Sequence, residues 1–162
     1  MSPEQSERLV AIGSDHAGYR LKEKLKAELG AMGYQVRDLG TDSEGPCDYP
    51  DFALAVAEAV GREEASKGVL VCGTGAGMAM VANKVPGVRA AACNELYTAE
   101  YCRSHNNANV LTMGARIIKP EAARRILHIF METDYEGSRP DGARHQGRLE
   151  KIKEVERKYM KE

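Results

Sequence analysis

Short apolar runs alternate along this chain with longer segments in which apolar residues recur at helical spacing. Runs of the length of a buried strand occupy residues 9–12, 69–72, 89–93 and 110–113, and residues 34–39 alternate as an edge strand does. Helical spacing marks residues 21–32, 52–60, 95–105, the stretch beyond Pro120 and the last segment, 149–160. Strands that alternate with helices predict a parallel sheet covered by helices on both faces.

This order of segments predicts the fold class. We expect an α/β protein with three layers, Rossmann-like (flavodoxin-like), in which a five-stranded parallel sheet lies between two layers of helices. At 162 residues the chain is long enough for one full core, so residues 1–162 are expected to form a single domain.

The last helical segment carries an apolar stripe on a highly charged background. The stripe consists of Leu149, Ile152, Val155 and Tyr159. A solvated surface helix has this pattern, and so does a helix that packs on another subunit. We expect this helix to pack on another subunit.

Composition narrows the function classes. The formal net charge of −1 argues against a general nucleic-acid binder. No apolar run approaches the roughly 18 residues of a membrane-spanning helix. The polar start MSPEQSER is unlike a signal peptide, so we expect a cytoplasmic protein. The four cysteines have no C-x-x-C pairing, which predicts reduced thiols and argues against a zinc site; they are Cys47, Cys72, Cys93 and Cys102.

The segment VLVCGTGAGMAM, residues 69–80, combines a strand, a glycine-rich turn and the start of a helix. Such a turn lets the backbone approach an anion, and the helix start points unpaired N–H groups at it. Cys72 stands where the partial positive charge of a helix N-terminus favours a thiolate. Met78 replaces the last glycine of a dinucleotide fingerprint, and no Gly-Lys-Ser/Thr follows as in a P-loop. Glycine turns and inert buried cysteines are also common in ordinary α/β cores.

Polar residues follow the predicted strands directly. Asp15 and His16 come after the first strand, and Cys72 ends the third. Ligands of parallel sheets bind at the carboxyl ends of strands, where the strand order reverses. These three side chains are therefore expected to meet in one crevice.

Four motifs together resemble the ribose-5-phosphate isomerase B family, which includes galactose- and allose-6-phosphate isomerases. The motifs are SDHAG from residue 14, CGTGAG from residue 72, RSHNNANVLTMGAR at 103–116 and ARHQGRLEKI from residue 143; DYPDF from residue 48 also fits. The resemblance runs from about residue 9 to the end of the chain. It implies an aldose–ketose isomerase that opens a furanose and moves a proton through an enediolate, without metal or cofactor.

The resemblance also implies roles for single residues. Cys72 matches the family's catalytic base; other members use a glutamate at the position of Met78, which cannot take a proton. His105 matches the ring-opening histidine, Asp15 a group that contacts sugar hydroxyls, and Thr74 lies inside the catalytic glycine loop.

The implied substrate contacts are more numerous. His16, Arg116, Arg144 and Arg148 match phosphate-binding positions, and the full implied set is Asp15, His16, Tyr49, Gly73, Thr74, Gly75, Ala76, Gly77, Asn106, Arg116, Arg144 and Arg148. The loop EGSRPDGA, residues 136–143, is longer than its counterpart in the family, which leaves the role of Arg139 open. Taken without the resemblance, the two arginines near the C-terminus would be ordinary surface charges. His105 would be a helix-end histidine satisfied by carbonyls.

The chain is thus expected to interconvert ribose 5-phosphate and ribulose 5-phosphate in the pentose phosphate pathway, as a homodimer or homotetramer whose sites are shared between subunits. An isomerase for a 6-phosphorylated hexose such as allose 6-phosphate remains an alternative. A non-catalytic phosphate- or nucleotide-binding module and a thiol redox enzyme remain further ones. The redox enzyme is disfavoured because no second cysteine lies close to Cys72 in the sequence.

Overall fold

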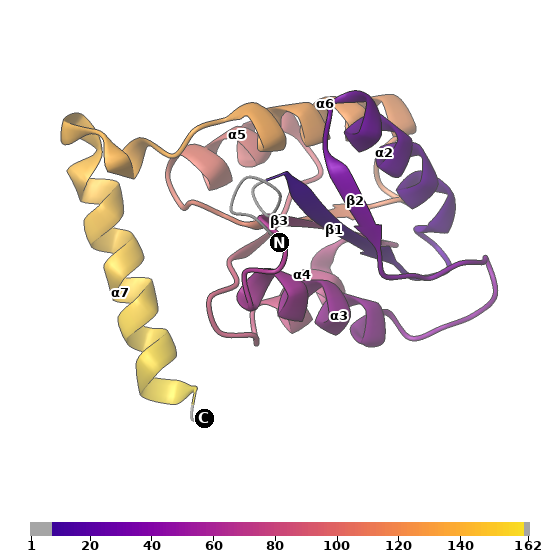
Figure 1. The fold of residues 1–162 in the computed structure, drawn as a ribbon, viewed down its shortest axis with the longest axis horizontal. Helices are drawn as coiled ribbons and strands as arrows, with labels where there is room; N and C mark the ends of the chain where they lie inside the picture. The colour runs from indigo at the N-terminus through magenta and orange to yellow at the C-terminus, as the bar shows by residue number, and fades with distance from the viewer. Residues whose placement is uncertain (1–7, 161–162) are drawn as a thin grey trace.

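A five-stranded sheet forms the centre of the molecule, and all of its paired strands run parallel (Figure 1). The computed structural model describes residues 8–160, so the predicted polar start at residues 1–7 lies outside the described part. The strands are β1 (Leu9–Ser14), β2 (Gln35–Asp38), β3 (Lys67–Cys72), β4 (Ala90–Ala92) and β5 (Val110–Gly114).

Helices cover both faces of the sheet, which confirms the predicted three-layer α/β class. One face carries α2 (Tyr19–Ala31), α5 (Leu96–Ser104) and α6 (Pro120–Glu132), and the other carries α3 (Tyr49–Gly61) and α4 (Ala76–Ala82). Alternate residues of each central strand enter the two cores. Val69 and Val71 pack with the first set of helices, and Leu70 and Cys72 with the second. No helix within residues 8–160 has the length and apolar character needed to cross a membrane.

The strand order is β2-β1-β3-β5-β4. The layers are those of a flavodoxin-like protein, but the last two strands are exchanged relative to the flavodoxin order 2-1-3-4-5. The order reverses between β1 and β3, so the crevice for a ligand lies at the carboxyl ends of these two strands. Because β5 lies next to β3, the segment that follows Gly114 also borders this crevice.

A buried lysine fixes the loop that borders the crevice. Lys22 of α2 is 1% exposed, and its Nζ lies 2.6 Å from Asp38 Oδ1 and donates to the carbonyl of Thr41 at 2.6 Å. The neighbouring ammonium groups, Lys22 above all, lower the pKa of Asp38 against the opposing effect of burial. The loop after β2 is therefore held against α2 by a charged anchor.

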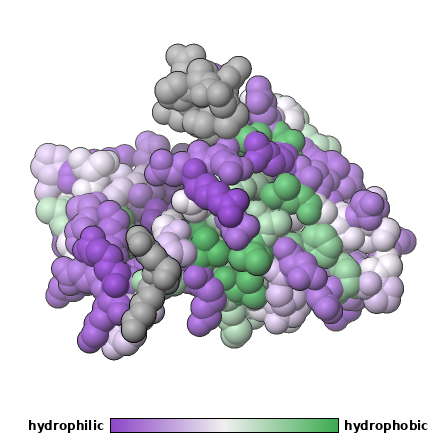
Figure 2. Space-filling model, turned by 60° about the horizontal axis from the view of Figure 1, so that its bottom comes forward, coloured by the Kyte–Doolittle hydropathy of each residue, from purple (hydrophilic) through white to green (hydrophobic). Residues whose placement is uncertain are grey.

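The helix α7 (Ala143–Tyr159) stands apart from the three layers (Figure 1). It follows two short 3-10 turns, η1 (Glu136–Ser138) and η2 (Pro140–Gly142), which are its main contacts within the chain. Ile152 and Val155 of the predicted stripe are exposed and line a largely apolar cavity of about 410 Å³ between α7 and β4. Figure 2 shows apolar side chains gathered on the face formed by α3 and α4, where Leu54 and Met80 are exposed.

Candidate active site

The glycine loop 73–77 joins β3 to α4 and encloses the thiol of Cys72. Cys72 is 5% exposed, and the backbone N–H of Gly75 donates to its Sγ at 3.1 Å. Gly75 has a φ of 82°, a conformation that glycine adopts without strain. The hydroxyl of Thr112 on β5 donates to the Gly75 carbonyl at 2.7 Å. The loop thus places a fixed N–H dipole beside the sulfur.

Asn94 holds the glycine loop against β5, and sequence reasoning missed it. Its Nδ2 donates to the carbonyl of Thr74 at 3.0 Å, and its Oδ1 accepts from the N–H of Gly114 at 2.8 Å. A Cβ on Gly114 would lie 2.8 Å from Thr74 backbone atoms, so this approach requires glycine. A signal was present, because Asn94 directly follows a predicted strand, as Asp15 does.

Two predicted substrate contacts cover the loop from other elements. The ring of Tyr49, at the start of α3, lies where a Cβ on Gly77 would be 2.7 Å from it. The Arg116 side chain lies over Gly73, with Nη1 3.4 Å from the corresponding Cβ position. Arg116 is exposed, so its guanidinium is accessible to an anion beside the glycine loop.

Asp15 and His16 follow β1 at the carboxyl end of the sheet, beside the end of β3. The N–H of Asp15 donates to the carbonyl of Val71 at 3.2 Å, and Asp15 Oδ1 accepts from Gly18 N–H at 3.0 Å. His16 Nδ1 accepts from the backbone N–H of Cys47 at 3.3 Å. A neutral His16 ring therefore carries its proton on Nε2, which can donate to a ligand.

The remaining predicted residues lie at the other end of the sheet, where the strands begin. His105 and Asn106 follow α5, which returns to the amino ends of the strands, and Val110 pairs beside Gly68 there. The strand from Gly68 to Cys72 rises by about 13 Å at roughly 3.3 Å per residue. The predicted site residues therefore form two separate groups within one chain, here named the first half-site (with Cys72) and the second half-site (with His105).

His105 is surrounded by groups that the sequence analysis did not select. Its ring stacks on that of His145 with centroids 4.0 Å apart, and it meets Tyr101 edge-on at 4.8 Å. Glu136 Oε2 lies 3.8 Å from His105 Nε2 and 3.9 Å from His145 Nε2. Burial, together with the positive charges of its neighbours, lowers the pKa of His145. The charged form of His145 is thus disfavoured where its ring stacks on the half-buried His105.

These three residues could hold a divalent cation. The ligand atoms of His105, Glu136 and His145 all lie within 4.8 Å of one another, and two imidazoles with a carboxylate form a donor set that suits zinc. The sequence contains no metal-ligand spacing, and the fold alone assembles this set. His145 could have been noticed inside the RHQGR motif, whereas Glu136 lies in the longer loop and had no signal.

The two predicted phosphate ligands of the C-terminal motif lie beside this trio. Arg144 and Arg148 share an exposed face of α7, one turn apart, while His145 points inward and is 3% exposed. Arg144 Nη1 donates to the carbonyl of Asp141 at 3.1 Å. Arg139 lies exposed between η1 and η2. The second half-site thus offers an imidazole and two guanidinium groups.

The candidate site combines a thiol beside a glycine loop with cationic residues that could bind phosphate, and it lies in an α/β domain. These features define the class of site as one for a small phosphorylated molecule. A family model described as Ribose/Galactose Isomerase matches residues 10–152. Ribose-5-phosphate isomerase B of Escherichia coli (strain K12) is 42% identical over 149 residues, covering 92% of this chain and 97% of that protein. D-erythrulose-4-phosphate isomerase of Pectobacterium atrosepticum is 42% identical over 129 residues, covering 79% of this chain and 85% of that protein.

Solved structures agree with the sequence comparisons. The structure of Clostridium thermocellum ribose-5-phosphate isomerase B aligns with a TM-score of 0.89 at 43% identity, covering 94% of this chain and 99% of that one. The chain therefore belongs to the ribose/galactose isomerase family, a family of sugar phosphate isomerases.

Proposed function

We propose that this chain interconverts ribose 5-phosphate and ribulose 5-phosphate, with Cys72 as the base. The observation that carries the proposal is the buried Cys72 thiol with the Gly75 N–H 3.1 Å from its sulfur, inside a loop that can receive an oxyanion. The fourfold motif match and the similarity to ribose-5-phosphate isomerases support the choice of substrate.

In the proposed reaction Cys72 removes the proton from carbon 2 of the open-chain aldose and delivers it to carbon 1 of the enediolate. The hydroxyl proton on the oxygen of carbon 2 passes to the oxygen of carbon 1, which completes the ketose. The negative charge that develops on the sugar oxygens is received by N–H groups of residues 73–77. Each preorganised donor of this kind contributes about 2.7–4 kcal/mol in the transition state. Asp15 binds sugar hydroxyls, Thr74 and Tyr49 border the reacting carbons, and no metal or cofactor takes part.

Ring opening needs a second subunit in this proposal. His105 lies at the amino ends of the strands, too far from the carboxyl ends to reach Cys72 of its own chain. In a homodimer, or a dimer paired into a tetramer, His105 of the partner subunit gives a proton to the ring oxygen. The bond between that oxygen and carbon 1 breaks, and the anomeric hydroxyl loses its proton to solvent as the carbonyl forms. Asn106 of the partner subunit contacts the sugar. The exposed apolar stripe of α7 supports this assembly.

The phosphate group is bound from both sides of the proposed interface. His16 and Arg116 come from the chain that supplies Cys72, and Arg144 and Arg148 come with His105 from the other. Guanidinium groups bind phosphate bidentately and stay charged, which suits a group that must hold the substrate throughout the reaction.

The four cysteines are free thiols, which agrees with the proposed cytoplasmic location.

A second candidate function is isomerisation of a different sugar phosphate. The relative from Pectobacterium atrosepticum, at the same 42% identity, is a D-erythrulose-4-phosphate isomerase, so identity at this level is compatible with several chain lengths. Substrate length is decided by the span between Cys72 and the phosphate-binding arginines of the partner subunit. A 6-phosphorylated hexose requires one carbon more of that span than a pentose.

The deciding experiment compares substrates side by side on the purified protein. Ribose 5-phosphate, D-erythrulose 4-phosphate, allose 6-phosphate and galactose 6-phosphate are assayed at equal concentrations for kcat/KM. We expect ribose 5-phosphate to be preferred. A higher kcat/KM on another substrate would reassign the chain within the family, and no turnover of any would favour a non-catalytic phosphate-binding protein.

A further inference from the structure

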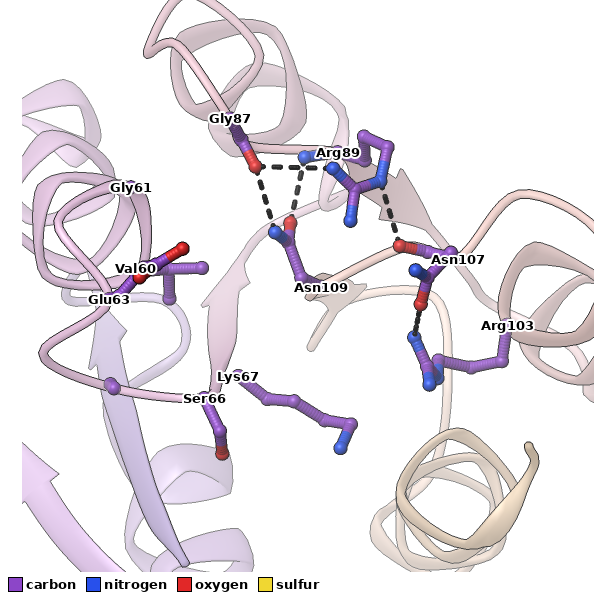
Figure 3. A pocket seen from close by; sticks show the side chains of 11 residues that line it. Val60, Gly61, Glu63, Ser66, Lys67, Gly87, Arg89, Arg103, Asn107 and Asn109 are labelled. Atoms are coloured by element: carbon purple, nitrogen blue, oxygen red, sulfur yellow. Dashed lines mark hydrogen bonds between the residues drawn. The ribbon is translucent and has the colours of Figure 1, made fainter. Parts of the chain in front are cut away.

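A polar cavity of about 430 Å³ lies at the amino ends of the central strands, away from Cys72 (Figure 3). Lys67 begins β3, Asn109 directly precedes β5, and Arg89 directly precedes β4. The volume lies in the range of about 300–1,000 Å³ that is typical of small-molecule sites. Since Lys67 is five residues before Cys72, the cavity and the thiol are separated by about 16 Å of strand.

Three cations line this cavity: Lys67, Arg89 and Arg103. None of the ion pairs formed within residues 8–160 involves them. Glu63 is exposed at the wall, and two further carboxylates act on the cations only through their fields: Asp134 on Lys67 and Arg103, and Glu156 on Arg89. Within the described part of the chain the three cations therefore border an open space without a directly paired carboxylate.

The two arginines use only part of their hydrogen-bonding capacity on the protein. Arg89 donates from Nε to the carbonyl of Asn107 at 2.8 Å, and Arg103 donates from Nη1 to the carbonyl of Ala108 at 2.6 Å. Arg103 is 8% exposed, yet its Nε has no partner within the described residues. An arginine has five N–H donors, so both retain donors after these contacts.

Lys67 is the third cation that lines the cavity. Burial and the nearby charge of Arg103 lower the pKa of Lys67, with Asp134 opposing them. Figure 3 shows its side chain extending across the cavity toward Arg103. A bound anion would relieve the repulsion between these cations.

We propose that this cavity is a second anion site, which binds the phosphate group of a small metabolite or free phosphate. Fork-shaped guanidinium groups with one ammonium are the donors that phosphate recognition uses. The cavity has room beyond a single phosphate for a small organic part.

Occupation of this site acts on the turn that carries His105 and Asn106. Arg103 and Arg89 brace that turn through the carbonyls of Ala108 and Asn107, and Arg103 also donates to Asn107 Oδ1 at 2.9 Å. An anion that fixes both guanidinium groups therefore stiffens residues 105–109. The consequence for catalysis rests on the proposed role of His105, whereas the binding itself does not.

The test is a calorimetric titration of the purified protein with inorganic phosphate at low salt. We expect two sites per chain, one in this cavity and one at the proposed substrate clamp. Lys67→Met should weaken the cavity site by at least about tenfold, the loss of one charged hydrogen bond. Lys67→Arg should retain it, and Lys24→Met, which removes the same charge from an exposed position of α2, should leave both sites unchanged.

The double variant Arg144→Ala/Arg148→Ala separates the two proposals. It should lose the clamp and keep the cavity site; if it keeps both, the proposed clamp is wrong and the cavity site stands. Hydrogen exchange of the amides of residues 106–108 should slow with phosphate in wild type and in this double variant, but not in Lys67→Met. Glycerol 2-phosphate in place of phosphate should give the same result, or no binding if free phosphate is the ligand. Equal phosphate binding by Lys67→Met and Lys24→Met would overturn the second site.

Discussion

At the scale of single residues, the environment of Cys72 separates it from the other three cysteines. Its sulfur receives a backbone N–H at 3.1 Å, whereas Cys93 and Cys102 face each other in the core with sulfurs 3.7 Å apart. The contact with Cys102 and burial raise the pKa of Cys93, so this thiol stays protonated. Met78 is fully buried and has no proton-accepting atom. Cys72 is thus the thiol that the glycine loop equips for base chemistry.

Replacing Cys72 by alanine should remove most turnover and leave the fold intact. A general base contributes about 10²–10⁴-fold in rate, and the loss should fall on kcat. Solvent-tritium incorporation into the product reports the proton transfer directly. Cys47→Ala is the matched control and should remain active, because Cys47 contacts His16 only at the edge of the crevice. Near wild-type exchange in Cys72→Ala would show that another group is the base.

A chelator should not reduce the activity of the purified protein. Backbone donors of the glycine loop are sufficient to hold an enediolate oxygen, so the proposed reaction needs no Lewis acid. The assembled trio of His105, Glu136 and His145 makes this a sharp test. Activity is measured after incubation with EDTA and after return of zinc or magnesium. Loss with EDTA and recovery with one ion would replace the metal-free mechanism.

Sequence reasoning selected candidate residues that lie in local motifs and did not select those whose approach depends on the fold. Cys72 and the loop 73–77 were predicted because strand, glycines and helix follow one another directly. Glu136 was missed because its approach to His105 depends on two 3-10 turns in a loop with no periodic pattern. The role of His105 itself came from the family resemblance, since its surroundings come from distant segments.

At the scale of elements, the short helix α4 approaches Tyr49 closely through its one glycine, Gly77. Gly77→Ala adds a methyl group that would lie 2.7 Å from the ring of Tyr49, so the ring must move away from the loop. We expect a several-fold rise in KM with little change in stability. Gly30→Ala is the control, because nothing lies within 4 Å of its Cβ position in α2. Alanine should stabilise that helix by about 0.5–1 kcal/mol and leave KM unchanged. An unchanged KM in Gly77→Ala would remove Tyr49 from the substrate contacts.

The helices α2 and α6 are joined by a histidine whose contribution depends on pH. His128 Nε2 lies 2.6 Å from Glu28 Oε1, and this hydrogen bond raises the pKa of His128 and lowers that of Glu28. Because the pKa of His128 is raised in the folded state, the charged imidazole contributes its full stabilisation below the unfolded-state pKa of about 6.5. This contribution is lost as the pH rises through the folded-state pKa. His128→Gln should therefore lower Tm more at about pH 5.5 than at about pH 9.

Arg124→Gln is the control for this pair. Arg124 Nε contacts the same Glu28 carboxylate at 2.9 Å, but arginine stays charged across the range, so its effect on Tm should be the same at both pH values. High salt should shrink both effects, because the groups are partly exposed. An equal Tm loss for His128→Gln at both pH values would contradict a role for the charged imidazole.

The sequence predicted the five strands but not their order in the sheet. Both 89–93 and 110–113 are short apolar runs, and periodicity does not tell which lies inside. The side chains carry a hint: β5 contains Val110, Leu111 and Met113 and is buried throughout, while β4 is three alanines and remains partly exposed. Larger side chains favour the central position because they bury more apolar surface.

At the scale of the whole molecule, the two half-sites lie at opposite edges of one sheet. The parallel strands all end where Cys72 and Asp15 lie, and each connecting helix returns the chain to the other edge, where His105 follows α5. This separation is a consequence of the parallel topology. A second copy that brings its amino edge to this crevice would complete the site, and α7 extends from that edge (Figure 1).

Complementation tests the shared site directly. Cys72→Ala and His105→Ala should each be inactive on ribose 5-phosphate. If the two variants are denatured, mixed equally and refolded, about half of the dimers should be mixed by random pairing. In a mixed dimer one site holds both lesions and the other holds none, so roughly a quarter of wild-type activity should return. Sites within single chains would each keep one lesion, and nothing would return. Mixed dimers detected by native mass spectrometry without recovered activity would therefore exclude a site built from two subunits.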